Sequence, residues 1–109
     1  MSVSLGSVVL KVQDLSRAGE FWKKALGYAS QAGNPAFLAR ADGTGPRLHL
    51  DEDDQTHLDL WVNRDNSDVQ TEVDRLVALG ARRVDWNYPE GAEFVVLADT
   101  EGNLFCVIA

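Results

Sequence analysis

Three side chains of this 109-residue chain are suited to binding a metal ion: its two histidines and its single cysteine. His49, His57 and Cys106 offer two imidazole nitrogens and one thiolate sulfur, a set that zinc accepts with water in the fourth position. Other roles stay open, because a lone strand cysteine is often a small buried apolar residue and a histidine can contact a neighbour or a ligand directly. These residues therefore predict either a zinc site or a metal-free polar patch.

The region around His57 has the alternation of a half-buried strand. In residues 57–62 the leucines and the valine occupy every second position, so the other side chains share the opposite face. Those side chains are His57, Asp59 and Trp61. Residues 7–12 show the same alternation fifty positions earlier, with Ser7, Val9 and Lys11 on the corresponding face. The two stretches predict equivalent strands.

A second pair of stretches supports an internal repeat. Residues 41–50 and 98–107 both place Ala-Asp-x-x-Gly before an alternating run, and in that register His49 corresponds to Cys106. Repeats fix the architecture, and these two copies are too few and too long for a solenoid. The repeat therefore defines four equivalent positions on four strands. They are occupied by Ser7, His49, His57 and Cys106.

Helical and turn signals complete each copy. An apolar stripe made of Ala18, Phe21, Trp22, Ala25 and Leu26 predicts a helix that begins after Asp14 or Ser16 and ends at Gly27. A second helix is expected after Asn66 or Ser67, ending at residues 78–80. The remaining strands are expected at residues 28–31, 36–40, 47–50, 82–85, 93–97 and 104–108, with a turn at 33–35.

These elements predict an α+β fold in which two βαβββ repeats form a curved mixed sheet, a cup, with a helix packed outside each half. We expect a single domain over residues 1–109, with repeats at about 5–50 and 56–109. The polar strand faces would line the cup, and Trp61, Trp86 and Tyr88 would offer flat surfaces for a ring or a cation. Lys11 could pair with Asp59, hold an anionic group or simply reach solvent at the mouth of the cup. Trp22 is expected in the core.

Composition narrows the class of partner. Ten basic and seventeen acidic side chains give a net charge of -7 without a Lys/Arg cluster, which argues against nucleic acid and anionic membranes. The same charge either favours a cationic ligand or serves solubility alone. No run approaches a membrane span, and the first residues lack the pattern of a signal peptide. A single cysteine excludes an internal disulfide. We therefore expect a cytoplasmic protein that binds a small organic molecule, aromatic or cationic.

The motifs and their order resemble a known superfamily. They run from Val12-Gln13-Asp14-Leu15 through Glu20-Phe21-Trp22 and Ala25-Leu26-Gly27 to residues 98–103. This order is similar to the vicinal oxygen chelate superfamily, which includes glyoxalases, bleomycin-resistance proteins and extradiol dioxygenases, and above all to its short glyoxalase-like domains. The resemblance implies a homodimer and a divalent metal bound at four cup-facing positions. Here those positions correspond to Ser7, His49, His57 and Cys106.

The residues at these positions keep only half of that ligand pattern. A non-haem iron dioxygenase needs a carboxylate where this chain has Cys106. A glyoxalase-type lyase needs a hard ligand set and a carboxylate base, and Asp59 is a weak substitute because two residues along a strand displace it by about 6.5 Å. We expect a metal-free binding protein, with a metal-dependent lyase or isomerase and an interaction module with a filled cup as alternatives.

Overall fold

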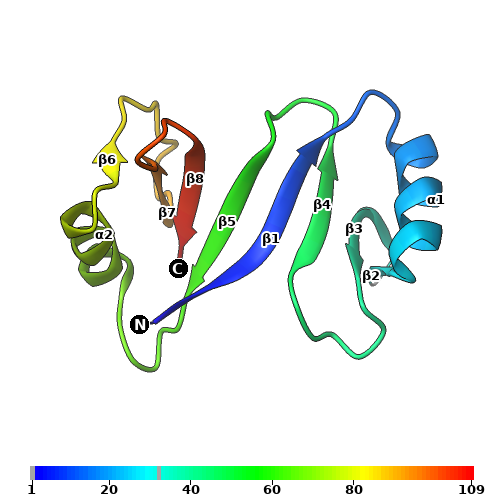
Figure 1. Ribbon diagram of the computed structural model, residues 1–109, viewed down its shortest axis with the longest axis horizontal. Coiled ribbons are helices and arrows are strands. Elements are labelled where there is room, and N and C mark those ends of the chain that lie inside the picture. The colour runs from blue at the N-terminus through cyan, green and yellow to red at the C-terminus, as the bar shows by residue number, and fades with distance from the viewer. Residues whose placement is uncertain (1, 32) are drawn as a thin grey trace. The chain divides into compact units, whose positions relative to one another are not determined.

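The computed structural model describes residues 2–31 and 33–109, whose helices and strands are drawn in Figure 1. Within these residues there are two helices and eight strands, so the fold class is α+β, as the sequence predicts. The elements are β1 (Val3–Lys11), α1 (Leu15–Leu26), β2 (Ala29–Gln31), β3 (Asn34–Ala39), β4 (Arg47–Asp51), β5 (His57–Val62), α2 (Val69–Ala78), β6 (Arg82–Arg83), β7 (Phe94–Ala98) and β8 (Leu104–Ile108). Neither helix has the length and apolar character needed to cross a membrane.

The chain forms two compact units that nearly coincide with the two repeats. The N-terminal unit is Gly6–Thr56, and the C-terminal unit is His57–Ala109 together with the first residues up to Leu5. In the N-terminal unit β1 pairs in parallel with β4, and β4 and β2 flank β3 in antiparallel pairs. In the C-terminal unit β5 pairs in parallel with β8, and β8 and β6 flank β7 in the same way. The matching strand order confirms the two βαβββ repeats.

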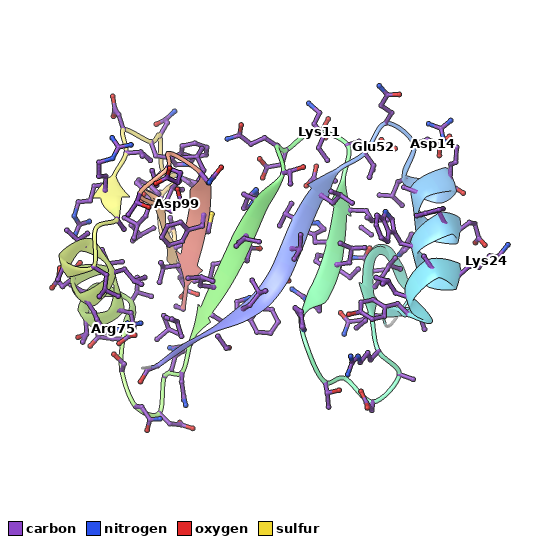
Figure 2. The ribbon with its side chains drawn as sticks, viewed as in Figure 1. Lys11, Asp14, Lys24, Glu52, Arg75 and Asp99 are labelled. Carbon is purple, nitrogen blue, oxygen red and sulfur yellow. The ribbon has the colours of Figure 1, made fainter. Side chains whose placement is uncertain are left out.

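Helix α1 covers one face of the strands in the N-terminal unit, where Figure 1 shows it beside β3. Asp14 caps its start by accepting a hydrogen bond from the backbone N of Arg17 at 3.0 Å, and Gly27 ends it in the left-handed conformation, as expected. Leu15 N donates to Glu52 Oε2 at 3.0 Å; both Asp14 and Glu52 are labelled in Figure 2. The start of the helix is thereby held by two carboxylates.

The apolar face of α1 is narrower than the predicted stripe. Leu15, Ala18 and Trp22 pack against a core whose buried members are Leu38, Leu48 and Leu50. Trp22 is therefore a core residue, as expected. Phe21 was expected there as well, but 61% of its surface is exposed, because the contact runs along the i, i+3, i+7 row of the helix. Phe21 falls beside that row.

Helix α2 covers the sheet of the C-terminal unit but begins one or two residues later than predicted. Its N-cap is Asp68, whose Oδ1 accepts from Thr71 N at 2.8 Å. Ser67, an expected cap, instead donates from its hydroxyl to Glu72 Oε2 at 2.7 Å. The core of this unit is a second apolar cluster beneath α2. Its buried members are Val62, Val73, Leu97, Phe105 and Val107.

Strand β1 begins at Val3 rather than at Ser7 because the start of the chain is held by the C-terminal unit. Ser2 donates its backbone N to Glu72 Oε1 at 3.3 Å, and the Ser2 carbonyl accepts from Asn63 N at 2.6 Å. Val3 packs against the core of the same unit. The Ser67 hydroxyl, followed by the contacts of Arg75 and Ser2, lowers the pKa of the buried Glu72 carboxyl below 4.5.

Other strand boundaries differ from the predictions by at most two residues, and those of β8 agree with them. The turn expected at residues 33–35 is shorter, since β3 already starts at Asn34, and β6 spans only two residues. The two Ala-Asp-x-x-Gly loops fold alike: Asp42 Oδ1 accepts from Thr44 N, and Asp99 Oδ1 accepts from Glu101 N, each at 2.9 Å. The cup and the single domain over residues 1–109 concern both units together and stay predictions.

Candidate functional site

The C-terminal unit has one apolar and one polar sheet face near its centre. Leu60 and Val107 pack with the core beneath α2, so the alternating neighbours on β5 and β8 face the other way. The side chains on this opposite face include His57, Asp59 and Trp61 from β5 and Cys106 from β8. We call it the polar face of the C-terminal unit.

Three of these side chains converge. Asp59 and Cys106 are direct partners across the parallel β5–β8 pair, and His57 precedes Asp59 on the same side of β5. The imidazole Nε2 of His57 lies 3.2 Å from Asp59 Oδ1, a distance at which an N–H can donate to a carboxylate. One ligating atom from each of the three residues lies within 4.8 Å of the others. We call His57, Asp59 and Cys106 the His57 cluster.

The position of Asp59 departs from the reasoning based on sequence spacing. Two residues along a strand separate the backbones by about 6.5 Å, yet the side chains of His57 and Asp59 lean together until their polar atoms meet. Both are mostly shielded, with 10% of the His57 side chain and 14% of the Asp59 side chain exposed. Asp59 therefore belongs to the centre of the cluster.

The donor atoms of the His57 cluster fit zinc better than a hard divalent ion. Zinc accepts imidazole nitrogen, carboxylate oxygen and thiolate sulfur in one tetrahedral set and can keep an open fourth position. Magnesium prefers an octahedral shell of oxygens, which a thiolate cannot supply. The cluster provides one nitrogen, one oxygen and one sulfur ligand. It differs from the expected set of His49, His57 and Cys106 in using Asp59, and that expected set stays a prediction.

Aromatic side chains border the polar face. Trp61 continues the His57 side of β5 and keeps 38% of its surface exposed. Tyr88 lies with its ring 5.5 Å from that of Phe94, and its hydroxyl accepts a hydrogen bond from Val96 N at 2.8 Å. Because Phe94 precedes Val95, which packs against the core, the Phe94 side chain lies on the polar face, and Tyr88 borders that face through its contact with Phe94. Trp86 is exposed in the connection between β6 and β7.

In the N-terminal unit the face opposite α1 holds the other expected residues. Ser7 is fully buried on β1, where its hydroxyl accepts a hydrogen bond from Arg47 Nε at 3.2 Å. Arg47 Nη1 also donates to Gln31 Oε1 at 3.4 Å, and its guanidinium carbon lies 4.6 Å from the centre of the Phe37 ring. Ser7 therefore positions an arginine in this unit. Lys11 is exposed at the end of β1.

His49 occupies the middle of β4 in this unit. Its ring stacks on Phe37 with centroids 4.2 Å apart, and its Nε2 lies 3.9 Å from Asp51 Oδ2. Sequence reasoning did not single out Arg47 or Phe37. The signal for Arg47 was its i, i+2 spacing to His49 on β4. The contribution of Phe37 depends on the β3–β4 register, which brings Phe37 opposite His49.

The negative charge of the chain is concentrated in one unit. The C-terminal unit carries four basic and ten acidic side chains, a net charge of -6, whereas the N-terminal unit carries six basic and seven acidic, a net charge of -1. A cation approaching the His57 cluster is therefore attracted by its surroundings as well as by Asp59. The N-terminal unit repels an anion far less.

Comparison with known proteins identifies similar domains. Residues 7–108 match the family described as glyoxalase-like domain. Comparison with curated proteins gave no match. Three solved structures share the fold. A hypothetical protein from Bacillus halodurans is 13% identical with a TM-score of 0.66, and the match covers 99% of this chain and 94% of that chain. The NAD-dependent benzaldehyde dehydrogenase from Legionella pneumophila is 18% identical with a TM-score of 0.64, covering 94% of this chain and 96% of that chain, and methylmalonyl-CoA epimerase from Mycobacterium tuberculosis is 22% identical with a TM-score of 0.60, covering 95% and 85%.

Proposed function

The chain belongs to the family of glyoxalase-like domains, and from this membership we propose that it binds a small organic molecule on the polar face of its C-terminal unit. The observation that carries the proposal is the His57 cluster. His57, Asp59 and Cys106 place an imidazole, a carboxylate and a thiol together on a partly shielded sheet surface. The exposed Trp61 beside them supplies a flat apolar surface.

The cluster is better explained by binding than by stability. Shielding a carboxylate from water costs free energy, and apolar side chains at the same sheet positions would avoid that cost. Proteins retain such arrangements most often where they serve a function. The polar atoms of His57 and Asp59 would contact the polar group of the ligand, and Cys106 would complete the surface beneath it.

The charge of the C-terminal unit indicates the class of ligand. Asp59 is an acceptor inside the cluster, and the unit as a whole has a net charge of -6. A ring that carries a cationic group could stack on Trp61 while its cation lies near Asp59. We therefore propose an aromatic amine or a similar ring-containing cation as the ligand.

A matched pair of probes and variants tests this proposal. Ligand-detected NMR would compare phenylethylammonium with the neutral phenylethanol. The cation should bind more tightly, and Asp59→Asn should weaken its binding by about tenfold, the loss of one charge-assisted contact. Asp74→Asn, a change at an exposed carboxylate on α2 of the same unit, should leave affinity unchanged. Equal binding by the Asp59→Asn variant would show that the ligand lies elsewhere.

A second candidate is a metal-dependent lyase or isomerase, which the convergence of three ligating atoms within 4.8 Å favours. His57, Asp59 and Cys106 would hold zinc, which when bound supplies a Lewis acid that polarises a carbonyl oxygen. The chain's own residues would fix the orientation of the ligand, with Trp61 against its ring. Metal analysis of protein purified without chelator separates this candidate from the metal-free one.

The two histidines give the metal test a matched control. If zinc is held by the His57 cluster, His57→Ala should lower zinc affinity by well over tenfold, since even the loss of an outer-shell partner costs a metal site about 10- to 100-fold. His49→Ala should retain it. Stoichiometric zinc in purified protein would reject metal-free binding, and loss of zinc in both variants would favour the set His49, His57 and Cys106.

The proposal also includes a cytoplasmic location, as expected from the sequence, and a homodimer, as expected from the family resemblance. The described residues leave several large apolar side chains exposed, among them Leu5, Leu26, Leu58 and Leu79. Light scattering during size exclusion would measure the mass, which for a dimer is twice the 12.0 kDa of the chain. A mass equal to that of one chain across the concentrations used would reject the dimer.

A further inference from the structure

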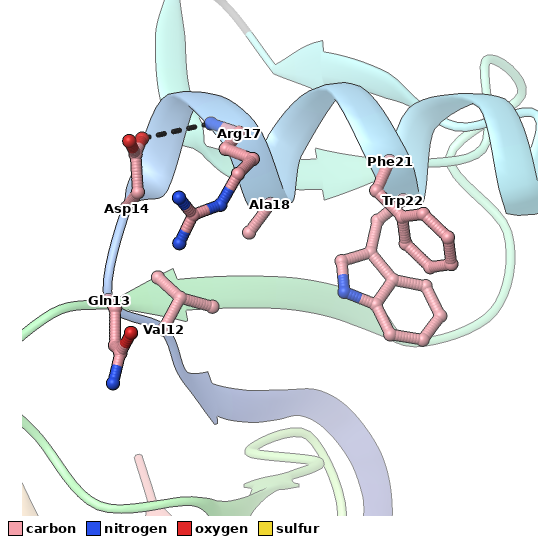
Figure 3. A pocket seen from close by; sticks show the side chains of 7 residues that line it. All are labelled: Val12, Gln13, Asp14, Arg17, Ala18, Phe21 and Trp22. Carbon is pink, nitrogen blue, oxygen red and sulfur yellow. Dashed lines mark hydrogen bonds between the residues drawn. The ribbon is translucent and has the colours of Figure 1, made fainter.

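The N-terminal unit has a pocket on α1 that is separate from the polar strand faces. It lies between the chain that leaves β1 and one side of α1, and its volume is about 440 Å³ (Figure 3). Small-molecule pockets typically have volumes of about 300–1,000 Å³. We call it the α1 pocket. Its lining residues are Val12, Gln13, Asp14, Arg17, Ala18, Phe21 and Trp22.

Two aromatic rings form one end of the α1 pocket. Phe21 and Trp22 meet edge to face with centroids 5.1 Å apart. Phe21 leaves 61% of its surface in water, so a ring that covers it would gain about 25 cal/mol for each Å² of apolar surface removed from water. Trp22 packs on the core and is therefore held in place. The two rings offer an edge and a face to a planar ligand, and Trp22 fixes one of them.

Hydrogen-bond donors face the same space. In Figure 3 the guanidinium of Arg17 and the indole nitrogen of Trp22 both point to the side where Val12 lies. The Asp14 carboxylate caps α1, since its Oδ1 accepts a hydrogen bond from Arg17 N at 3.0 Å. Among the residues that the structure describes, no carboxylate lies within ion-pair distance of the Arg17 guanidinium. The pocket thus combines a cation that lacks an ion-pair partner with a neutral N–H donor.

We propose that the α1 pocket binds a small aromatic carboxylate. Arg17 receives the carboxylate, because a guanidinium offers two parallel N–H groups to its two oxygens. Phe21 and Trp22 receive the ring, and the Trp22 N–H is placed to donate to an acceptor on the ligand. The N-terminal unit has a net charge of -1 against -6 for the C-terminal unit, so it repels an approaching anion less.

Titration with naphthoate tests the proposal, with the indole N–H signals of the three tryptophans followed in proton–nitrogen correlation spectra. Trp22→Phe identifies the Trp22 signal by its absence. In the unmodified protein this signal should shift and saturate with naphthoate. The neutral analogue naphthylmethanol should bind about tenfold more weakly, which corresponds to about 1.4 kcal/mol.

Two charge variants on the same helix provide the control. Arg17→Gln removes the pocket cation and should weaken naphthoate binding about tenfold, the loss of a charge-assisted contact. Lys24→Gln removes an equal charge from the outer side of α1, where Figure 2 shows Lys24 directed away from the helix, and should leave binding unchanged. Equal weakening by both variants, no saturable shift of the Trp22 signal, or loss of binding only in Asp59→Asn would each overturn the proposal.

Discussion

The contact between His57 and Asp59 should stabilise the protein more than the similar contact between His49 and Asp51. Both pairs are two residues apart on a strand, but the nearest polar atoms are 3.2 Å apart in the first pair and 3.9 Å in the second. The first pair exposes 10% and 14% of its side chains, the second 25% and 28%. Hydrogen-bonding distance and shielding from water both favour the first pair.

The expected magnitudes follow from these geometries. A hydrogen bond to a charged group contributes about 1.5–3 kcal/mol, whereas exposed pairs beyond that distance contribute about 0–1 kcal/mol. We therefore expect a coupling free energy of about 1–2 kcal/mol between His57 and Asp59. For His49 and Asp51 we expect less than about 0.5 kcal/mol.

Double-mutant cycles measured by urea unfolding at neutral pH provide the assay. Each cycle compares the two single alanine variants with the double variant, which cancels contacts that either residue makes elsewhere. This matters for Asp51, whose Oδ1 also accepts from the backbone N of Asp53 and of Asp54. A coupling below about 0.5 kcal/mol for His57 and Asp59, or one no larger than that of the other pair, would refute the reasoning.

Three further predictions concern stability. Leu97→Ala, in the core of the C-terminal unit, should lower the unfolding free energy by about 2–5 kcal/mol in urea denaturation, whereas Leu79→Ala at an exposed position should change it by less than about 0.5 kcal/mol. Asp14→Ala should cost about 1 kcal/mol in the same assay, because it removes the N-cap of α1, with Ser16→Ala as the control near zero. Because the pKa of Glu72 is lowered in the folded protein, its contribution is complete above pH 4.5 and is lost as the pH falls through the folded pKa; melting temperatures at descending pH should therefore fall less steeply in Glu72→Gln than in the unmodified protein.

Local patterns predicted the fold well because the signals lie within each element. The alternation of apolar and polar residues predicted the strands. The two Ala-Asp-x-x-Gly loops fold alike because the aspartate carboxylate in each accepts a hydrogen bond from the backbone N two residues on. The cap of α2 could not be assigned, since Asn66, Ser67 and Asp68 are all good capping residues. Asp68 takes this place, and the Ser67 hydroxyl instead donates to Glu72, five residues on.

The candidate site was only partly predictable because the spacing of residues along a strand does not determine the direction in which each side chain leans. Alternation alone puts His57 and Cys106 on one face of the C-terminal unit. The meeting of His57 with Asp59 depends on how both side chains lean along β5. The Arg47–Phe37 contact needed the antiparallel register of β3 and β4. The exposure of Phe21 depends on which row of α1 the sheet contacts.

The most direct test of the His57 cluster as the binding centre uses Cys106, the single cysteine of the chain. Its rate of reaction with a thiol reagent would be measured with and without phenylethylammonium, with binding followed in parallel by NMR. A ligand held over the cluster should slow the reaction about tenfold when its free concentration is ten times its dissociation constant. An unchanged rate while the ligand is bound to saturation would contradict the account.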